Sequence, residues 1–216
     1  MSRINSDIES IGNTIRENMS TKHEARDKAI KASRDVIYKC STSIRAVHRG
    51  EFERARELAD SAKAMLDDMN EAIAEHDELH YTGFVNDSHK EYAEARITLA
   101  LISGTELPHP EDLEVSYPAY LNGLGEAGGE LRRHILDAMR HGDMDHCEEV
   151  LDMMDDIYSL LVTIDFPDAL TGGLRRTTDM VRGVLERSRG DLTVALRQRE
   201  LETKLDRFND KLGKEV

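Results

Sequence analysis

Two pairs of glutamates are the residues whose type and spacing point most directly to chemistry. Glu91 and Glu94 stand three residues apart, and Glu126 and Glu130 stand four residues apart. On a helix, this spacing places both carboxylates of a pair on one face. Crowded carboxylates repel one another, and the repulsion is relieved by raised pKa values or by a hard divalent cation such as Mg²⁺. Four acids that met would supply the metal site of a phosphodiester nuclease.

Both pairs also have an ordinary explanation, since helices carry many acids on solvated faces. The neighbours of Glu91 and Glu94 include Tyr92, Ala93 and Ile97. A helix that is this apolar is less readily assigned to the surface, so its acids are better candidates for a site.

The second pair lies in a stretch rich in glycine. Gly123, Gly125, Gly128 and Gly129 fall within residues 123–129, and each costs a helix up to about 1 kcal/mol relative to alanine. Two explanations remain open, a close helix crossing and room for a metal with a phosphate backbone. The spacing favours the crossing.

Composition favours a single all-α domain over residues 1–216. Charged residues make up 33% of the chain and aromatic residues 5%, with no Trp and four Pro, a mixture typical of long solvated helices. Cys40 and Cys147 form no metal or disulfide motif, which fits a reducing compartment. No apolar run reaches the length of a membrane span, so we expect a soluble, cytoplasmic protein with no membrane partner.

Helical periodicity predicts six or seven helices and no strand. The first is one long helix or two collinear ones, with Gly12 and residues 18–21 as candidate breaks. Three of the four prolines fall between residues 108 and 118, which predicts a loop. Asp143 is placed to cap a helix, and Pro167 to start the last one. The predicted helices cover residues 5–48, 51–74, 86–103, 119–140, 143–164 and 167–208.

Three stretches of the chain match, in order, the motifs of one known family. Residues 31–35 (KASRD), followed by Ile44 and the pair His48 and Arg49, resemble its first-helix signature. Residues 91–94 (EYAE) resemble its E-Y-x-E motif, and residues 120–131 (YLNGLGEAGGEL) resemble its Y-L-x-G-x-x-D-x-x-G-E-L motif. The family is the translin superfamily, and the similarity is strongest to its nuclease branch, translin-associated factor X and its archaeal relatives.

This resemblance implies a seven-helix bundle and an Mg²⁺-dependent endoribonuclease, with Mn²⁺ as a substitute, that cuts single-stranded RNA inside a homo-oligomeric, roughly octameric shell. Single-stranded DNA is a further nucleic acid to consider. The catalytic and metal-binding acids would be Glu91, Glu94, Glu126 and Glu130. Glu126 stands where the family usually has Asp, and the extra methylene shifts its oxygens by about an ångström, which matters because Mg²⁺ is strict about distances.

With 43 acidic residues against 29 Lys and Arg, the chain has a net charge of −14, which should repel nucleic acid at long range. RNA must therefore bind at a local site. With 5% aromatic residues, binding through backbone charge is favoured over base stacking. Basic side chains on helices more often pair with a neighbouring acid than with phosphate. The candidate phosphate contacts are Arg34, Arg45, His48, Arg49, His89, Lys90, Arg96, Arg132 and Arg133.

Two alternatives to a nuclease are a di-iron protein and a non-catalytic binding protein. A di-iron site requires Glu-x-x-His on two helices, and neither acidic motif supplies the histidine. His80 and His146 each follow an Asp by three residues, and we interpret both as surface histidines. The stronger alternative is a non-catalytic RNA- or DNA-binding assembly protein with the translin fold.

Overall fold

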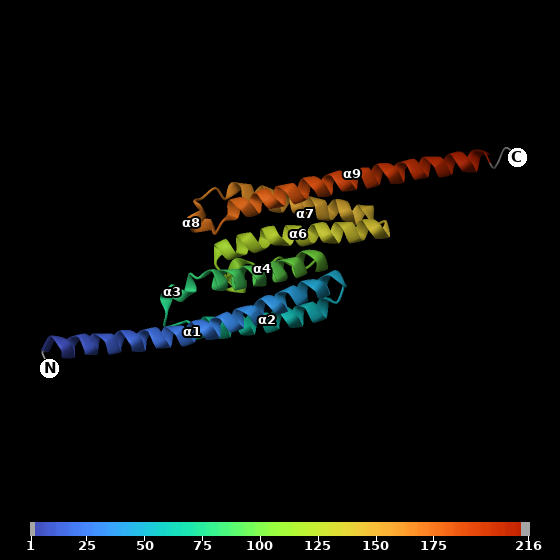
Figure 1. Cartoon of the computed structure of the whole chain (residues 1–216). Helices are drawn as coiled ribbons and strands as arrows, with labels where there is room; N and C mark the ends of the chain where they lie inside the picture. The colour runs from blue at the N-terminus through green and yellow to red at the C-terminus, as the bar shows by residue number, and fades with distance from the viewer. Residues whose placement is uncertain (1–2, 213–216) are drawn as a thin grey trace. The chain divides into compact units, whose positions relative to one another are not determined.

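Helices account for all the regular secondary structure in residues 3–212, the part of the chain that the computed structural model describes (Figure 1). The all-α prediction is therefore confirmed, and no helix in this range is long and apolar enough to cross a bilayer. Six helices are long and three have four residues each. The long helices are α1 (Arg3–His48), α2 (Phe52–Ala72), α4 (Gly83–Ser103), α6 (Tyr117–His141), α7 (Met144–Thr163) and α9 (Leu174–Leu212). The short ones are α3 (Asp77–His80), α5 (Pro110–Leu113) and α8 (Asp168–Thr171).

Contacts divide the chain into two compact units, which are described separately. Unit 1 comprises residues 1–120 and unit 2 residues 121–216, so the boundary falls within α6. A single domain over residues 1–216 stays a prediction, and its ends at residues 1–2 and 213–216 lie outside the described residues.

The structure corrects several predicted helix boundaries. The first helix is continuous for 46 residues, without a break at Gly12 or at residues 18–21. The last helix does not start at Pro167, which instead caps α8. Gly172 and Gly173 then adopt φ values of +60° and +83°, a left-handed conformation that ends α8, and α9 begins at Leu174. The predicted loop at residues 108–118 contains α5, a single turn with proline at its first position.

In unit 1, α1 and α2 pack as an antiparallel pair (Figure 1). Gly50 makes the turn between them with φ +72°. The contact is close because the buried face of α2 carries alanines, and Ala55, Ala59 and Ala62 are fully buried. Ser43 on α1 donates a hydrogen bond of 2.7 Å to the carbonyl oxygen of Ala55, which joins the two backbones near the turn.

A pair of buried serines fixes α4 against α1 within the same unit. Ser88 on α4 donates to Oγ of Ser33 on α1 at 2.8 Å, and Ser33 donates to the carbonyl oxygen of Phe84 at 3.2 Å. Ser33 belongs to the KASRD stretch, so this part of the first-helix motif holds α4. Glu91 follows Ser88 by three residues, so the serine contact positions the acidic segment.

Unit 2 is built on residues 121–141 of α6, which pack with α7 and α9. An added Cβ at Gly125 would lie 2.3 Å from Cγ2 of Thr177 on α9, and 3.4 Å from both Leu161 on α7 and Val181 on α9. The helix-crossing explanation therefore holds for Gly125. It does not hold for Gly129, where an added Cβ would have no neighbour within 4 Å.

Asn122 anchors the connection between α8 and α9 to α6. Its Nδ2 donates to the carbonyl oxygen of Thr171 at 2.9 Å, and Thr177 donates to its Oδ1 at 2.6 Å. Thr177 is held in this way against the glycine crossing. The third residue of the YLNG stretch is thus structural, and it fixes how α9 starts.

The glycine crossing predicts opposite effects for two neighbouring substitutions. Gly125→Ala forces a methyl group against a hydrogen-bonded Thr177, so we expect a loss of about 1–3 kcal/mol in the free energy of unfolding. Gly129→Ala meets no atom and gains helix propensity, so we expect a gain of up to about 1 kcal/mol. Urea unfolding of the two variants measures both values, and equal effects would contradict the crossing.

Candidate metal centre

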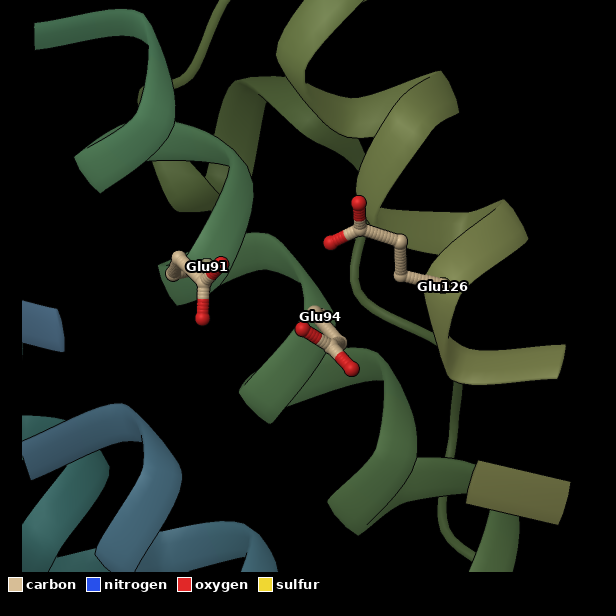
Figure 2. A group of neighbouring side chains, drawn as sticks. All are labelled: Glu91, Glu94 and Glu126. Atoms are coloured by element: carbon tan, nitrogen blue, oxygen red, sulfur yellow. The ribbon is translucent and has the colours of Figure 1, made fainter. Parts of the chain in front are cut away.

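The α4 pair places two carboxylates close together on a mostly buried helix. Glu94 is only 9% exposed, and its neighbours Ala93 and Ala95 are fully buried. One carboxylate oxygen of Glu91 and one of Glu94 lie within 4.8 Å of each other, and Figure 2 shows both side chains on α4. Nζ of Lys90 lies 3.7 Å from Oε1 of Glu91, so a cation already offsets part of this charge.

The negative charge of this pair reaches the α1 side of unit 1. Cys40 on α1 is fully buried, and its thiol pKa is raised, first by burial and then by the charges of Glu91 and Glu94. Because the thiolate is disfavoured, Cys40 is neither a nucleophile nor a metal ligand at neutral pH. The carboxylates of α4 are the reactive groups on this side.

The α6 pair lies in unit 2, where both acids are half-buried. Glu126 and Glu130 stand one turn apart on α6, as the sequence predicted, and Figure 2 shows Glu126 on that helix. Oε2 of Glu130 lies 3.9 Å from Nη1 of Arg133, at ion-pair distance. This pair, like the first, therefore carries a basic residue beside it.

These acids offer the donor set of a hard cation. Glu91, Glu94 and Glu126 can each offer one carboxylate oxygen to a metal ion. Carboxylate oxygens suit Mg²⁺ and Mn²⁺, whereas zinc sites usually contain nitrogen or sulfur ligands. The residues therefore fit the metal that the sequence predicted.

Three of the predicted phosphate contacts are held by acids within their own unit. Nε of Arg49 lies 2.7 Å from Glu51, Nη1 of Arg96 lies 2.9 Å from Asp60, and Nη2 of Arg132 lies 2.8 Å from Asp191. A phosphate would have to compete with these carboxylates.

Arg34 and Arg45 are better placed to meet a phosphate. Both are exposed on α1, eleven residues apart and so on one face of the helix. Arg45 donates to Oγ1 of Thr42 at 2.8 Å, a neutral partner that leaves its charge available. His48, also on α1, is half-buried at the end of that helix.

His89 is a poor phosphate ligand at neutral pH. Its Nε2 lies 3.2 Å from Oδ1 of Asn70, and its pKa is lowered, first by burial and then by the nearby charges of Lys63 and His80. The imidazole is therefore neutral at pH 7, when a phosphate contact would need it charged.

Sequence reasoning missed the residues that support the acids. Cys40 and Ser33 contact α4 from a helix about fifty residues away in the chain, and one sequence carries no signal for such a contact. Asn122 was visible only as part of a motif. Its burial and its place beside the glycine crossing, which define its structural role, are visible only in the structure.

Three solved structures that are similar to this chain are all C3PO structures. The chain is 34% identical to AfC3PO in a complex with duplex RNA, covering 87% of this chain and 97% of that one, with a TM-score of 0.80. AfC3PO alone gives 33% identity, the same coverage and a TM-score of 0.79. Apo-NeC3PO, at 18% identity over 86% of this chain and 96% of that one with a TM-score of 0.76, shares the fold.

An uncharacterized protein of Methanocaldococcus jannaschii is 26% identical over 202 residues, which cover 91% of this chain and 88% of that protein. No protein-family model matches the chain. The C3PO structures are of the translin and translin-associated factor X type. The chain therefore belongs to the translin superfamily, in the branch of translin-associated factor X.

The lowered pKa of His89 predicts how stability changes with pH. Because the folded state binds this proton less tightly than the unfolded state, the contribution of His89 is present above about pH 6.5 and is lost as the pH falls below that value. His89→Gln should reduce the loss of unfolding free energy between pH 7.5 and 5.5 in urea titrations. The matched control is His141→Gln, at an exposed histidine. An unchanged loss in His89→Gln would contradict the assignment.

Proposed function

We propose that this chain is a metal-dependent endoribonuclease in which Glu91, Glu94, Glu126 and Glu130 hold Mg²⁺ or Mn²⁺. The observation that carries the proposal is the pair formed by the buried Glu94 and the half-buried Glu91, with oxygens within 4.8 Å of each other, at the positions of the family's E-Y-x-E motif. Two carboxylates this close favour a divalent cation, whose charge exceeds that of the single Lys90 ammonium beside Glu91. The proposal requires α4 of unit 1 and α6 of unit 2 to present their acids to one ion.

RNA is the proposed substrate. AfC3PO, which is 34% identical over most of the chain, forms a complex with duplex RNA, and this supports RNA binding here. The single-stranded preference comes from the family resemblance and is part of the proposal. Arg34 and Arg45 on α1 are the proposed contacts to the RNA backbone. Both are exposed, and neither forms an ion pair with a carboxylate in the part of the chain that the structure describes.

In the proposed phosphodiester hydrolysis, the divalent ion, the acids and the basic residues would have separate roles. A divalent ion supplies Lewis acidity toward the scissile phosphate and lowers the pKa of a bound water. The four glutamates hold and orient that ion, so no side-chain nucleophile is needed. Lys90 and Arg133 each lie beside one acid, and they would limit repulsion between the acids and the phosphate.

Homo-oligomerisation is part of the proposal, and exposed apolar stripes on two long helices support it. Figure 1 shows the first part of α1 extending beyond α2 and the last part of α9 extending beyond α7. Such stripes at a spacing of three to four residues are typical of helix pairing between chains. They comprise Ile4, Ile8, Ile11, Ile15 and Met19 on α1, and Val194, Leu201, Leu205 and Phe208 on α9, each more than half exposed. An octamer and a cytoplasmic location stay predictions.

The nuclease proposal predicts loss of cutting when one acid loses its charge. Glu94→Gln and Glu126→Gln should each lower the cleavage rate of a labelled single-stranded RNA by at least about a hundredfold in Mg²⁺, since an ion loses a charged ligand. Glu126→Asp keeps the charge and gives the residue usual in the family, so it should keep activity. Glu106→Gln, at an exposed acid in the loop after α4, is the control.

The assay runs with Mg²⁺, Mn²⁺ or EDTA, on single-stranded and duplex RNA. RNA binding without cutting under either metal would favour the non-catalytic binding protein. Cutting that persists in EDTA, or in Glu94→Gln, would contradict the proposed site.

The exposed stripes predict that assembly depends on the end of α9. The double change Leu201→Glu and Leu205→Glu should shift the protein to a smaller species, because paired carboxylates would be buried in an apolar interface. Light scattering after size-exclusion chromatography measures the mass. Leu170→Glu, at a leucine that is 65% exposed outside the stripes, is the control. An unchanged mass in the double variant would exclude this face from the interface.

A further inference from the structure

Two histidines meet inside unit 2, and neither belongs to the four candidate acids. Nε2 of His134 on α6 lies 2.8 Å from Nε2 of His146 on α7, and the two rings are perpendicular, with centroids 5.0 Å apart. Two nitrogens at this distance cannot both carry a proton. One nitrogen donates its proton to the other, so at least one of the two rings presents a deprotonated Nε2 in this contact. His146, interpreted from the sequence as a surface histidine, is half-buried and contacts His134.

We infer that His134 and His146 form a transition-metal site, of the class that takes Zn²⁺, Ni²⁺ or Cu²⁺. Imidazole nitrogen suits these ions, whereas Mg²⁺ prefers oxygen. Tetrahedral zinc with bonds of about 2.0–2.1 Å places two ligand nitrogens about 3.4 Å apart. The two Nε2 atoms would have to move about half an ångström further apart to reach this spacing. A small rotation of either ring allows that movement.

The tautomer of His146 is set for metal binding. Its Nδ1 lies 3.5 Å from Oε2 of Glu149, one turn further along α7. A carboxylate at Nδ1 holds the proton on that nitrogen, so Nε2 of His146 accepts the hydrogen bond from His134 and has a lone pair that a metal can take instead.

The helices that carry the pair are fixed beside it. Asp143 caps α7 by accepting a hydrogen bond from the backbone N–H of His146 at 3.3 Å. Sγ of Cys147 lies 3.6 Å from the carbonyl oxygen of Ile135, so the residues next to both histidines are in contact. The site therefore rests on two packed helices and needs little reorganisation.

The surroundings are acidic, which favours a dication. The first turns of α7 carry Asp145, Glu148 and Glu149 close to His146, and Asp137 follows His134 by one turn on α6. Water or one of these exposed carboxylates can complete the coordination. The inference does not depend on the nuclease proposal, because neither histidine belongs to the carboxylate set.

The test is a calorimetric Zn²⁺ titration of the untagged, chelator-treated full chain. We expect one site of micromolar affinity that weakens at least tenfold in His134→Gln and in His146→Gln. The same site should persist in Glu126→Gln and in His141→Gln, a histidine whose Nδ1 contacts the backbone of Asp137. Circular dichroism melts confirm that each variant is folded, and Zn²⁺ should raise the melting temperature only where both histidines are present.

Electron paramagnetic resonance of bound Cu²⁺ gives a second readout, since coupling to two imidazole nitrogens is expected. Unchanged Zn²⁺ affinity in folded His134→Gln and His146→Gln would overturn the inference. So would a folded wild-type chain that binds no Zn²⁺, which would leave the pair as a shared-proton contact. Loss of RNA cutting in Glu126→Gln with Zn²⁺ binding intact would separate this site from the nuclease.

Discussion

Repulsion between two carboxylates is the constraint that organises this chain. Oxygens of Glu91 and Glu94 lie within 4.8 Å of each other in a segment of α4 whose neighbouring residues Tyr92, Ala93 and Ala95 are buried. At an effective dielectric constant of about 20, two such charges repel by an energy on the order of 3 kcal/mol. Lys90 offsets part of that energy beside Glu91, and the contacts that hold the helix oppose the rest.

The rest of unit 1 provides that support. The alanine face of α2 lets α1 approach closely, and the Ser33 and Ser88 hydrogen bond ties α4 to α1 one turn before Glu91. Cys40 fills the space on the α1 side and stays neutral because burial and the two acids disfavour its thiolate. Unit 2 uses the same principle at Gly125, where a missing side chain lets α9 approach α6.

Sequence patterns predicted the fold class, because apolar periodicity and caps act locally. Asp143 was recognised as a cap, and it accepts the predicted hydrogen bond. The break between α8 and α9 was missed because two consecutive glycines are compatible with a helix until a tertiary contact, here Asn122 with Thr171, selects the left-handed turn. Arg96 and Arg132 form ion pairs with acids on helices distant in sequence. The sequence therefore could not predict that these two side chains are already paired. The acids were found because their spacing is local.

Ligand chemistry would separate hard from borderline metals at the two proposed sites. Glu91, Glu94 and Glu126 offer oxygen alone, whereas His134 and His146 offer nitrogen. An acidic protein attracts both kinds of cation, and the ligand set then decides which ion stays. The net charge of −14 would repel RNA at long range, so the proposed RNA binding depends on local cations.

The central proposal is that acids of α4 and α6 bind one divalent ion. Anomalous diffraction from crystals of the protein soaked in Mn²⁺ tests it most directly, because the ion is located without reference to activity. The account predicts an anomalous peak about 2.2 Å from carboxylate oxygens of Glu91, Glu94 and Glu126. A peak bound by the α4 acids alone, or by residues elsewhere, would contradict it.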